Sequence, residues 1–300
     1  MTTALVTGAR GFIGRHVAKE LASQGYTVSG IGRGDWPDRK EWGLSTWKRA
    51  EVSPESLPSK SVDLVVHCAG GSSVPHSVAM PAEHWSTTVP GFRSVLEWMR
   101  IGPGQGAKLV LLSSGAVYGS VKKLPIKEDA PRKPVSVYGA CKVECEITAQ
   151  TLAREYGLSV AIVRLFSVYG PGLQRQLLWD AARKGRSGET RFSGTGAERR
   201  DWLHVSDAAK LLVLACQRAD RTVPVVNGGT GIGTSVADVV RSLYRELGIA
   251  TEPAFDGSAR AGDPTDYIAA IEAAKNLGWS PSMPLSEGLA DYARWFATCP

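Results

Sequence analysis

The 300-residue sequence lacks a long hydrophobic run and lacks any block of like charges. Its longest apolar stretches, such as 211–216, fall far short of the roughly 18 residues that cross a bilayer, so no membrane span is expected. Lys and Arg exceed Asp and Glu by only 6 and are spread along the chain, which argues against a nucleic-acid-binding arm. A small polyanionic ligand fits this modest surplus better.

Cysteine is also scarce, and no two cysteines have C-x-x-C spacing. The chain has five: Cys68, Cys141, Cys145, Cys216 and Cys299. An odd number without C-x-x-C spacing argues against a disulfide framework and a zinc knuckle. We therefore predict free thiols, no metal site and a reducing, cytoplasmic compartment. An apolar, strand-like run begins at residue 4, so no signal peptide is expected.

What the first half does contain is an alternation of short apolar runs and amphipathic stretches. The runs cover 4–7, 27–31, 62–67, 108–113 and 159–165, with a weaker one at 46–51. Helix-like segments lie between them, near 12–24, 81–100 and 137–156. This alternation is typical of βαβ units. The sequence therefore predicts an α/β fold with a doubly wound parallel sheet of the Rossmann type.

The composition changes after Phe166. Residues 183–200 are rich in Gly, Arg, Ser and Thr, which predicts loops and a short strand. Helices are predicted over 205–218 and 235–247, with two more at the end of the chain. We predict a dinucleotide-binding domain over 1–165 and a smaller, mainly substrate-binding lobe over 166–300. Residues 200–228 are expected to pack back onto the first domain.

A glycine-rich turn follows the first predicted strand and opens a helix. Gly8 permits the tight turn, Gly11 lets the backbone approach a pyrophosphate, and Gly14 lets the helix pack closely on the strand. The helix N-terminus then presents free N–H groups to the phosphates. We predict that this turn binds a dinucleotide through Gly8, Arg10, Gly11, Phe12, Ile13 and Gly14.

The end of the second strand bears on which dinucleotide is bound. A carboxylate there would bind the ribose 2′-hydroxyl and repel a 2′-phosphate. The sequence has Gly32, Arg33 and Gly34 instead, and Arg33 and Arg10 could both bind a 2′-phosphate. We therefore predict NADP, while Asp35, two residues further on, leaves NAD possible.

Three side chains suggest acid–base chemistry. Tyr138 and Lys142 are four residues apart in a predicted helix and so share one face. The ammonium favours the phenolate, which suits Tyr138 to general acid or base catalysis, and Lys142 can also bond the nicotinamide ribose. Ser114 stands at the carboxyl end of a predicted parallel strand, where it can hold the substrate oxygen beside Tyr138. We predict Ser114, Tyr138 and Lys142 as the catalytic set.

With these three features in place, the chain resembles the extended short-chain dehydrogenase/reductases. Within them it resembles the NAD(P)-dependent epimerase/dehydratase group that acts on nucleotide sugars. The resemblance covers nearly the whole chain, and its further motifs lie at 65–70, 164–172, 200–207, 262–264 and 277–281. It implies that Glu51 and Val52 lie around the adenine, and that Cys68, Ala69 and Gly70 line the cofactor. It also implies a homodimer formed by the helices near 81–100 and 137–156. Trp85, Trp98 and Val143 could contribute to it, and they fit the core equally well.

The resemblance further implies a nucleoside-diphosphate sugar as substrate. Arg200 inherits a contact with the diphosphate by its position, and a guanidinium suits bidentate phosphate binding. The alternative is a structural arginine paired with Asp201 or Asp207. Three other arginines of the same lobe are weaker candidates: Arg175, Arg191 and Arg260.

Two departures from the family pattern concern the substrate. Ser167 stands where the family usually has an Asn that helps to hold the sugar nucleotide, and we predict that Ser167 contacts the substrate. Thr88 likewise replaces an Asn in the helix before the catalytic strand. Both substitutes keep a hydrogen-bonding group with a shorter reach.

The residues after Ser114 narrow the reaction. Dehydratases of the family carry an Asp-Glu pair where this chain has Gly115 and Ala116, so elimination of water is not expected. The arginine argument makes reduction of a 4-keto sugar by NADPH, with Tyr138 as general acid, the main expectation. The alternative is a 4-epimerase that keeps NAD and returns the hydride it has taken. Lesser alternatives are a non-sugar ketone reductase and a non-catalytic dinucleotide sensor.

Overall fold

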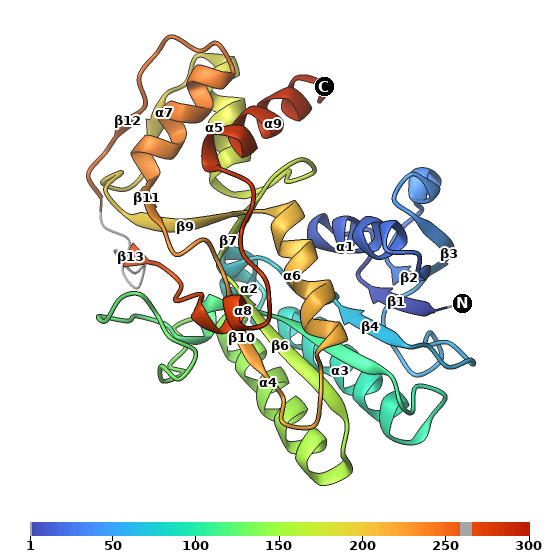
Figure 1. Ribbon diagram of the computed structural model, residues 1–300. Helices are drawn as coiled ribbons and strands as arrows, with labels where there is room; N and C mark the ends of the chain where they lie inside the picture. The colour runs from blue at the N-terminus through green and yellow to red at the C-terminus, as the bar shows by residue number, and fades with distance from the viewer. Residues whose placement is uncertain (1, 259–265) are drawn as a thin grey trace.

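A seven-stranded parallel sheet lies at the centre of the computed structural model, which describes residues 2–258 and 266–300 (Figure 1). Its strands are, in sheet order, β10 (Val225–Gly228), β6 (Ser159–Leu165), β5 (Lys108–Ser114), β4 (Leu64–His67), β1 (Thr3–Thr7), β2 (Thr27–Gly32) and β3 (Leu44–Arg49). The strand order reverses between β1 and β4, and a crevice for ligands is expected at the carboxyl ends of strands at such a point. The prediction of a doubly wound parallel sheet is confirmed.

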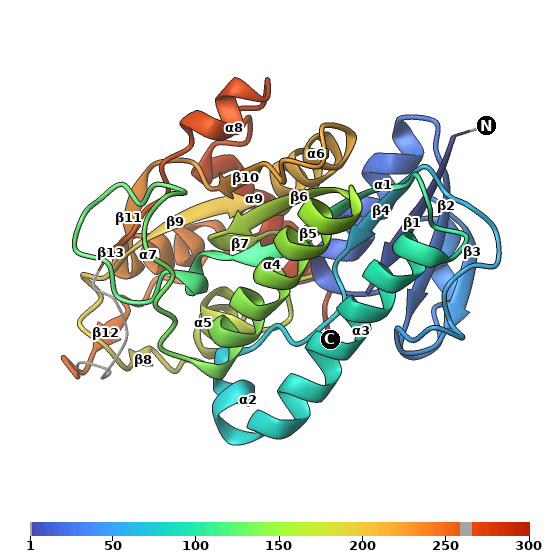
Figure 2. The same ribbon diagram turned by 90° about the horizontal axis from the view of Figure 1, so that it is seen from below.

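Helices cover both faces of this sheet (Figure 2). One face carries α3 (Pro81–Ile101) and α4 (Val137–Tyr156), and the other carries α1 (Phe12–Ser23) and α6 (Val205–Gln217). Neighbouring side chains of a strand point to opposite faces. Val65 and Leu109 therefore pack with α3 and α4, whereas Val66 and Val110 pack with α1 and α6. Burial on both sides explains why these strands are continuous apolar runs in the sequence.

A second, smaller sheet leads into a helical lobe. It joins β11 (Gly233–Ser235), β9 (Arg199–His204) and β13 (Asp266–Tyr267), with β7 (Ser167–Tyr169) also paired to β9. A third core lies among α5 (Gln176–Ser187), α7 (Val236–Glu246) and α9 (Leu285–Ala297), which gather near the C-terminus in Figure 1. The other elements are α2 (Val74–Ala79), α8 (Glu272–Asn276), the 3-10 turns η1 (Pro37–Lys40) and η2 (Gly115–Val117), and the pair β8 (Arg191–Phe192) and β12 (Ala254–Phe255).

The structure differs from the prediction at two places. Residues 183–200 are not all loop and strand, because α5 continues to Ser187 before Gly188 ends it at φ +78°. The last turn of α5 is polar because it faces solvent, and its composition therefore imitates a loop. Strand β3 begins at Leu44, two residues before the predicted start, because Leu44 is buried while the polar residues after it lie on the exposed sheet edge.

Three further properties concern the described residues alone. No helix among them is long and apolar enough to cross a bilayer. No group of three or more His, Cys, Asp or Glu among them is placed to hold a metal ion. All five cysteines are unbridged.

Candidate active site

The glycine-rich turn fits tightly against the end of β4. Gly8 has φ +67°, and its N–H donates to the Ile31 carbonyl at 2.7 Å. A Cβ at Gly8 would lie within 2.7–2.9 Å of the backbone of Cys68 and Ala69, so a larger residue has no room there. A Cβ at Gly14 would collide with the Gly8 carbonyl. Helix α1 begins at Phe12 without a side-chain cap, which leaves its first N–H groups free to face an anion.

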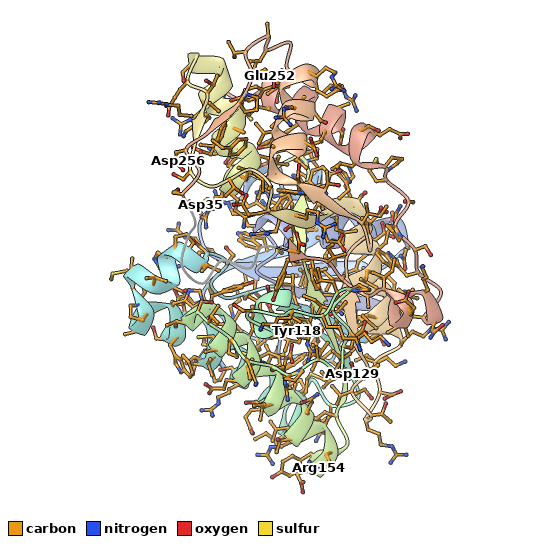
Figure 3. All side chains as sticks on the ribbon, turned by 90° about the vertical axis from the view of Figure 1, so that its left-hand side faces the viewer. Asp35, Tyr118, Asp129, Arg154, Glu252 and Asp256 are labelled. Atoms are coloured by element: carbon orange, nitrogen blue, oxygen red, sulfur yellow. The ribbon has the colours of Figure 1, made fainter. Side chains whose placement is uncertain are left out.

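The turn after β2 carries Arg33 and Asp35, and each is contacted by an arginine from another segment. The Arg10 Nη1 donates to the Arg33 carbonyl at 3.4 Å, which joins the glycine-rich turn to the β2 end. The Arg49 Nη1 lies 3.1 Å from both oxygens of Asp35 on the surface, where Figure 3 labels Asp35. Gly32 ends β2, and a Cβ there would lie 2.8 Å from the Trp47 ring. A side chain at position 32 would therefore collide with the Trp47 indole.

The remaining predicted cofactor residues lie along neighbouring strand ends. Cys68, Ala69 and Gly70 directly follow β4, with the Cys68 N–H donating to the Thr7 carbonyl of β1. Glu51 is exposed just after β3, and Val52 is partly buried against α3.

The predicted catalytic residues lie on β5 and on the first turns of α4, which packs against the turn after β5. Tyr138 lies in the first turn of α4, where its backbone N–H donates to the Ser77 hydroxyl at 3.2 Å. The Lys142 ammonium is buried, 5.9 Å from the centre of the Tyr138 ring, and donates to the Leu112 carbonyl at 2.9 Å. Ser114 is the last residue of β5, and its hydroxyl accepts from the Ala116 N–H at 3.2 Å. A Cβ at position 139 would lie 2.6 Å from the Ala116 carbonyl, so α4 begins in contact with this turn.

His84 is a residue of this site that sequence reasoning missed. It lies on α3 with 1% of its surface exposed, and neither ring nitrogen has a hydrogen-bond partner. Its ring is edge-on to that of Tyr138, with 5.8 Å between the centres, and presses against the backbone of Gly71. Burial, followed by the charge of Lys142, lowers the pKa of His84, so the imidazole is neutral at physiological pH. The only sequence signal was a histidine within an apolar helix.

The predicted substrate residues lie on the second sheet. Ser167 is half-buried at the start of β7, opposite Trp202 of β9. Arg200 lies on β9 between Tyr267 of β13 and Thr234 of β11. Its Nη1 donates to the Arg199 carbonyl at 3.0 Å.

Asp201 and Asp207, the predicted alternative partners of Arg200, are held by other groups. Asp201 accepts the N–H groups of Thr230, Gly231 and Ala269, and Asp207 accepts those of residues 282 and 283. The other three candidate arginines lie apart from Arg200 in the sequence. Arg175 occupies the N-cap position of α5 without a side-chain cap hydrogen bond, and Arg191 is exposed on β8. Arg260 and the 262–264 motif lie outside the described residues.

Tyr267 connects the lobe to the catalytic strand. Its hydroxyl donates to the carbonyl of Gly115, the residue after Ser114. Its ring packs 5.3 Å from the centre of the Phe166 ring. A side chain at position 115 would collide with this ring, since a Cβ there would lie 2.9 Å from it. Sequence reasoning missed Tyr267 because it depends on a contact over 152 residues.

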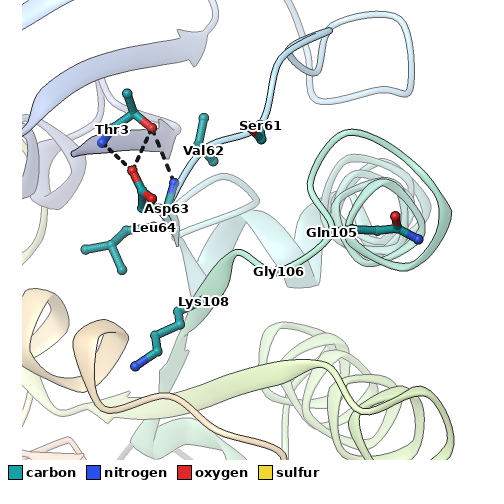
Figure 4. A pocket seen from close by; sticks show the side chains of 8 residues that line it. All are labelled: Thr3, Ser61, Val62, Asp63, Leu64, Gln105, Gly106 and Lys108. Carbon is teal, nitrogen blue, oxygen red and sulfur yellow. Dashed lines mark hydrogen bonds between the residues drawn. The ribbon is translucent and has the colours of Figure 1, made fainter. Parts of the chain in front are cut away.

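A hollow of the described part of the chain lies away from these residues. It has a volume of about 630 Å³ and sits at the amino ends of β1, β4 and β5, opposite the catalytic edge (Figure 4). Asp63 lines it and accepts hydrogen bonds from the backbone and hydroxyl of Thr3. None of the predicted site residues lines it, so this hollow is separate from the candidate active site.

Comparison with known proteins agrees with this geometry. Residues 4–229 match the family described as the NAD dependent epimerase/dehydratase family. The chain belongs to this family. It is 32% identical to a putative UDP-glucose 4-epimerase of Methanocaldococcus jannaschii, with 97% of each chain covered. It is also 32% identical to the UDP-glucose 4-epimerase of Corynebacterium glutamicum, with 92% of this chain and 90% of the other covered.

Solved structures of related proteins share the whole fold. The UDP-glucose 4-epimerase of Thermotoga maritima with UDP-glucose has a TM-score of 0.88 at 30% identity and covers 99% of each chain. MoeE5 in complex with UDP-glucuronic acid and NAD has a TM-score of 0.87 at 32% identity, with 98% and 99% covered. The predicted family and enzyme class are confirmed. The expected preference for ketoreduction is not supported, because these relatives are named as epimerases and NAD is the dinucleotide that the MoeE5 structure contains.

Proposed function

We propose that the protein is a 4-epimerase of a UDP-hexose or a UDP-hexuronate. The observation that carries this proposal is the placement of Tyr138 and Lys142 on the first turns of α4, beside Ser114 at the carboxyl end of β5. The epimerase names of the relatives support the reaction, and Gly115 and Ala116 leave no acid–base pair for dehydration.

The glycine-rich turn fits a dinucleotide. Its close packing at Gly8 and Gly14 and the uncapped N-terminus of α1 form a cradle for a pyrophosphate. When bound there, the nicotinamide would accept a hydride from the sugar C4 and return it to the other face. Residues Gly8 to Gly14 would hold the pyrophosphate, and Lys142 would hold the ribose.

The chain's own residues move and hold the proton. The Tyr138 phenolate accepts the proton of the sugar 4-hydroxyl as the C4 hydride leaves, and gives the proton back to the same oxygen when the hydride returns. The bond from the Lys142 ammonium to the Leu112 carbonyl fixes this cation 5.9 Å from the centre of the Tyr138 ring. The Ser114 hydroxyl donates to the sugar O4 and keeps it beside Tyr138.

The test is conversion without any added reductant. Incubation of the purified protein with UDP-glucose, and separately with UDP-glucuronate, is expected to give the C4 epimer with no net change in nicotinamide absorbance. Tyr138→Phe serves as the control for contaminating epimerase. Failure to convert either sugar nucleotide, with a dinucleotide shown to be bound, would reject the epimerase.

A second candidate, an NADP-dependent reductase of a 4-keto sugar, is favoured by one observation. The β2 end offers Arg10 and Arg33 to a 2′-phosphate, Trp47 fills the space beside Gly32, and Arg49 binds Asp35. The dinucleotide released by denaturing the purified protein distinguishes the candidates. Tightly held NAD supports the epimerase, whereas an empty protein that consumes NADPH in proportion to a UDP-4-keto-hexose supports the reductase.

We further propose a homodimer through α3 and α4. Trp85 and Ile101 of α3 and Ile147 of α4 are exposed apolar side chains. Trp98 is not among the candidates, because it is buried and its indole N–H donates to the Pro58 carbonyl at 2.9 Å. Sedimentation equilibrium is expected to show a dimer for the wild type and a monomer for Ile147→Glu, because the added charge would be buried at the interface.

A further inference from the structure

A buried carboxylate joins the catalytic helix to the catalytic strand. Glu146 is fully buried on α4, one turn after Lys142 and two turns after Tyr138, so the three side chains share one face of the helix. Its Oε1 accepts the hydroxyl of Ser113 at 2.6 Å and the Nε of Arg164 at 2.9 Å. Ser113 directly precedes Ser114, so this contact is made one residue away from the predicted substrate-binding hydroxyl.

Two guanidinium groups neutralise this carboxylate: the half-buried Arg132, whose Nη1 donates to Glu146 Oε2 at 3.1 Å, and the buried Arg164. Arg164 lies on β6 with 3% of its surface exposed, and its Nη2 donates to Glu146 Oε2 at 2.7 Å. Its Nη1 donates to the Tyr118 hydroxyl and to the Glu128 carbonyl, each at 2.8 Å. Tyr118 lies inside the molecule (Figure 3) and donates to Asn227 of β10 at 2.7 Å. The network therefore spans β5, α4, β6, β10 and the segment between Ser114 and Tyr138.

Stability alone does not account for such a pair. Removing two charges from water costs about as much as their attraction returns, and an apolar pair of similar volume is often no less stable. What a hydrogen-bonded ion pair adds is direction, because each oxygen of Glu146 must face a particular donor. The pair therefore fixes how α4 lies along β5.

The contacts along β5 show which register is fixed. Lys142 donates to the carbonyl of Leu112, and Glu146 accepts from Ser113. Consecutive residues of the strand are thus bonded by consecutive turns of the helix, and the next strand residue is Ser114. A slip or tilt of α4 would displace Tyr138 and Lys142 from Ser114 together.

We propose that Glu146, paired with Arg164, is a positioning residue that sets Tyr138 and Lys142 against Ser114. It touches neither sugar nor dinucleotide and acts through the placement of α4. The inference rests on the proposed function for its kinetic test, and on the placement of α4 alone for its second test.

The decisive variant replaces the pair by apolar residues of similar size, Glu146→Leu with Arg164→Met. This double variant leaves neither of the two fully buried charges unpaired, which would destabilise the fold and obscure the result. Arg132 also loses Glu146, but its side chain is 28% exposed to solvent and its Nη1 keeps the bond to Gln150 at 3.4 Å. We expect a melting temperature near that of the wild type, an unchanged KM for the sugar nucleotide and the same bound dinucleotide. We expect kcat to fall by about 10²-fold, the scale on which a displacement of about 1 Å acts in an active site. If the ion pair has no positioning role, the double variant should instead keep both the kcat and the stability of the wild type.

Two further variants test the contact with the strand and provide a control. Ser113→Ala removes only the bond to the strand, and we expect roughly a tenfold lower kcat at unchanged KM. Glu144→Gln is the matched control, because Glu144 lies on the same helix but forms its ion pair with Arg93 on the outer face. It is expected to leave both constants unchanged.

Hydrogen exchange provides a readout that needs no substrate. In the double variant we expect faster exchange in the first two turns of α4, with unchanged protection in the middle of α3. Wild-type kcat together with wild-type protection would overturn the positioning role. A wild-type protein that fails to epimerise, yet shows this change in exchange when the pair is replaced, would reject the proposed function and keep the positioning role.

Discussion

At the scale of the residue, the proposed chemistry depends most on one phenol. Tyr138→Phe removes the proton acceptor while the Ser77 bond to the backbone and the packing against His84 remain. Loss of a general acid–base group costs about 10²–10⁴-fold in rate, so kcat is expected to fall by at least 10²-fold. The check is turnover of UDP-glucose, with bound dinucleotide and melting temperature measured alongside. A variant with normal turnover would show that Tyr138 has no acid–base role.

Arg33 is the residue through which the predicted preference for NADP can be tested. Arg33→Asp replaces an exposed cation by an anion at the β2 end, which would repel a 2′-phosphate. NADPH is expected to bind at least about tenfold more weakly, a change of about 1.4 kcal/mol, while NADH binding is maintained. Fluorescence titration of dinucleotide-free protein measures both. Lys40→Asp makes the same charge change in exposed η1, and an equal effect there would mean that the field of the whole surface is responsible.

The sequence could predict those site residues whose partners lie close to them along the chain. Gly8 and Gly14 serve one local turn, and Tyr138 and Lys142 lie one helical turn apart, so short spacing revealed them. His84 and Tyr267 act through contacts with residues 54 and 152 positions away. No single-sequence pattern encodes such distances, and the three-dimensional packing was needed to find them.

At the scale of the element, the strands were predictable because burial on both faces makes them continuous apolar runs. Helix ends were harder. The end of α5 resembles a loop in composition, and only the left-handed Gly188 marks it. Helix α2 is six residues long, too short for an amphipathic period, and begins where the Ser73 hydroxyl accepts the His76 N–H.

Strand β4 carries a histidine that makes stability depend on pH. Burial, and then the charge of Lys142, lowers the pKa of His67 from 6.5 to about 3. Between pH 6.5 and pH 3, His67 is therefore protonated in the unfolded chain but neutral in the folded protein. The free energy of unfolding falls as the pH drops through this range. Between pH 7 and pH 5 this residue is expected to cost about 2 kcal/mol.

Denaturant unfolding at the two pH values checks this expectation. His67→Asn removes the titrating group, keeps a polar atom for the Thr7 hydroxyl that His67 now bonds at 2.9 Å, and should lose about 2 kcal/mol less than the wild type on acidification. Parallel losses in the two proteins would assign the acid sensitivity to other groups.

At the scale of the whole molecule, the two parts of the chain are interleaved. Strand β10 and helix α6 follow the first strands of the second sheet in sequence, yet they belong to the central sheet and its covering layer. Tyr267 then brings β13 onto the turn after Ser114. The division into a domain over 1–165 and a lobe over 166–300 stays a prediction, as does the packing of residues 200–228 onto the first domain.

If Arg200 contacts the diphosphate of a sugar nucleotide, as predicted, binding of that ligand should stabilise the folded protein. A ligand that binds only the folded state adds RT ln(1 + [L]/Kd), about 2.7 kcal/mol at a concentration one hundred times Kd. UDP is therefore expected to raise the melting temperature, and inorganic phosphate at the same concentration much less.

Arg200→Gln should remove most of the UDP effect, since the predicted bidentate partner of the diphosphate is lost. Arg191→Gln, on exposed β8, should keep it. A UDP shift that survives Arg200→Gln but disappears with Arg191→Gln would move the diphosphate site from β9 to β8.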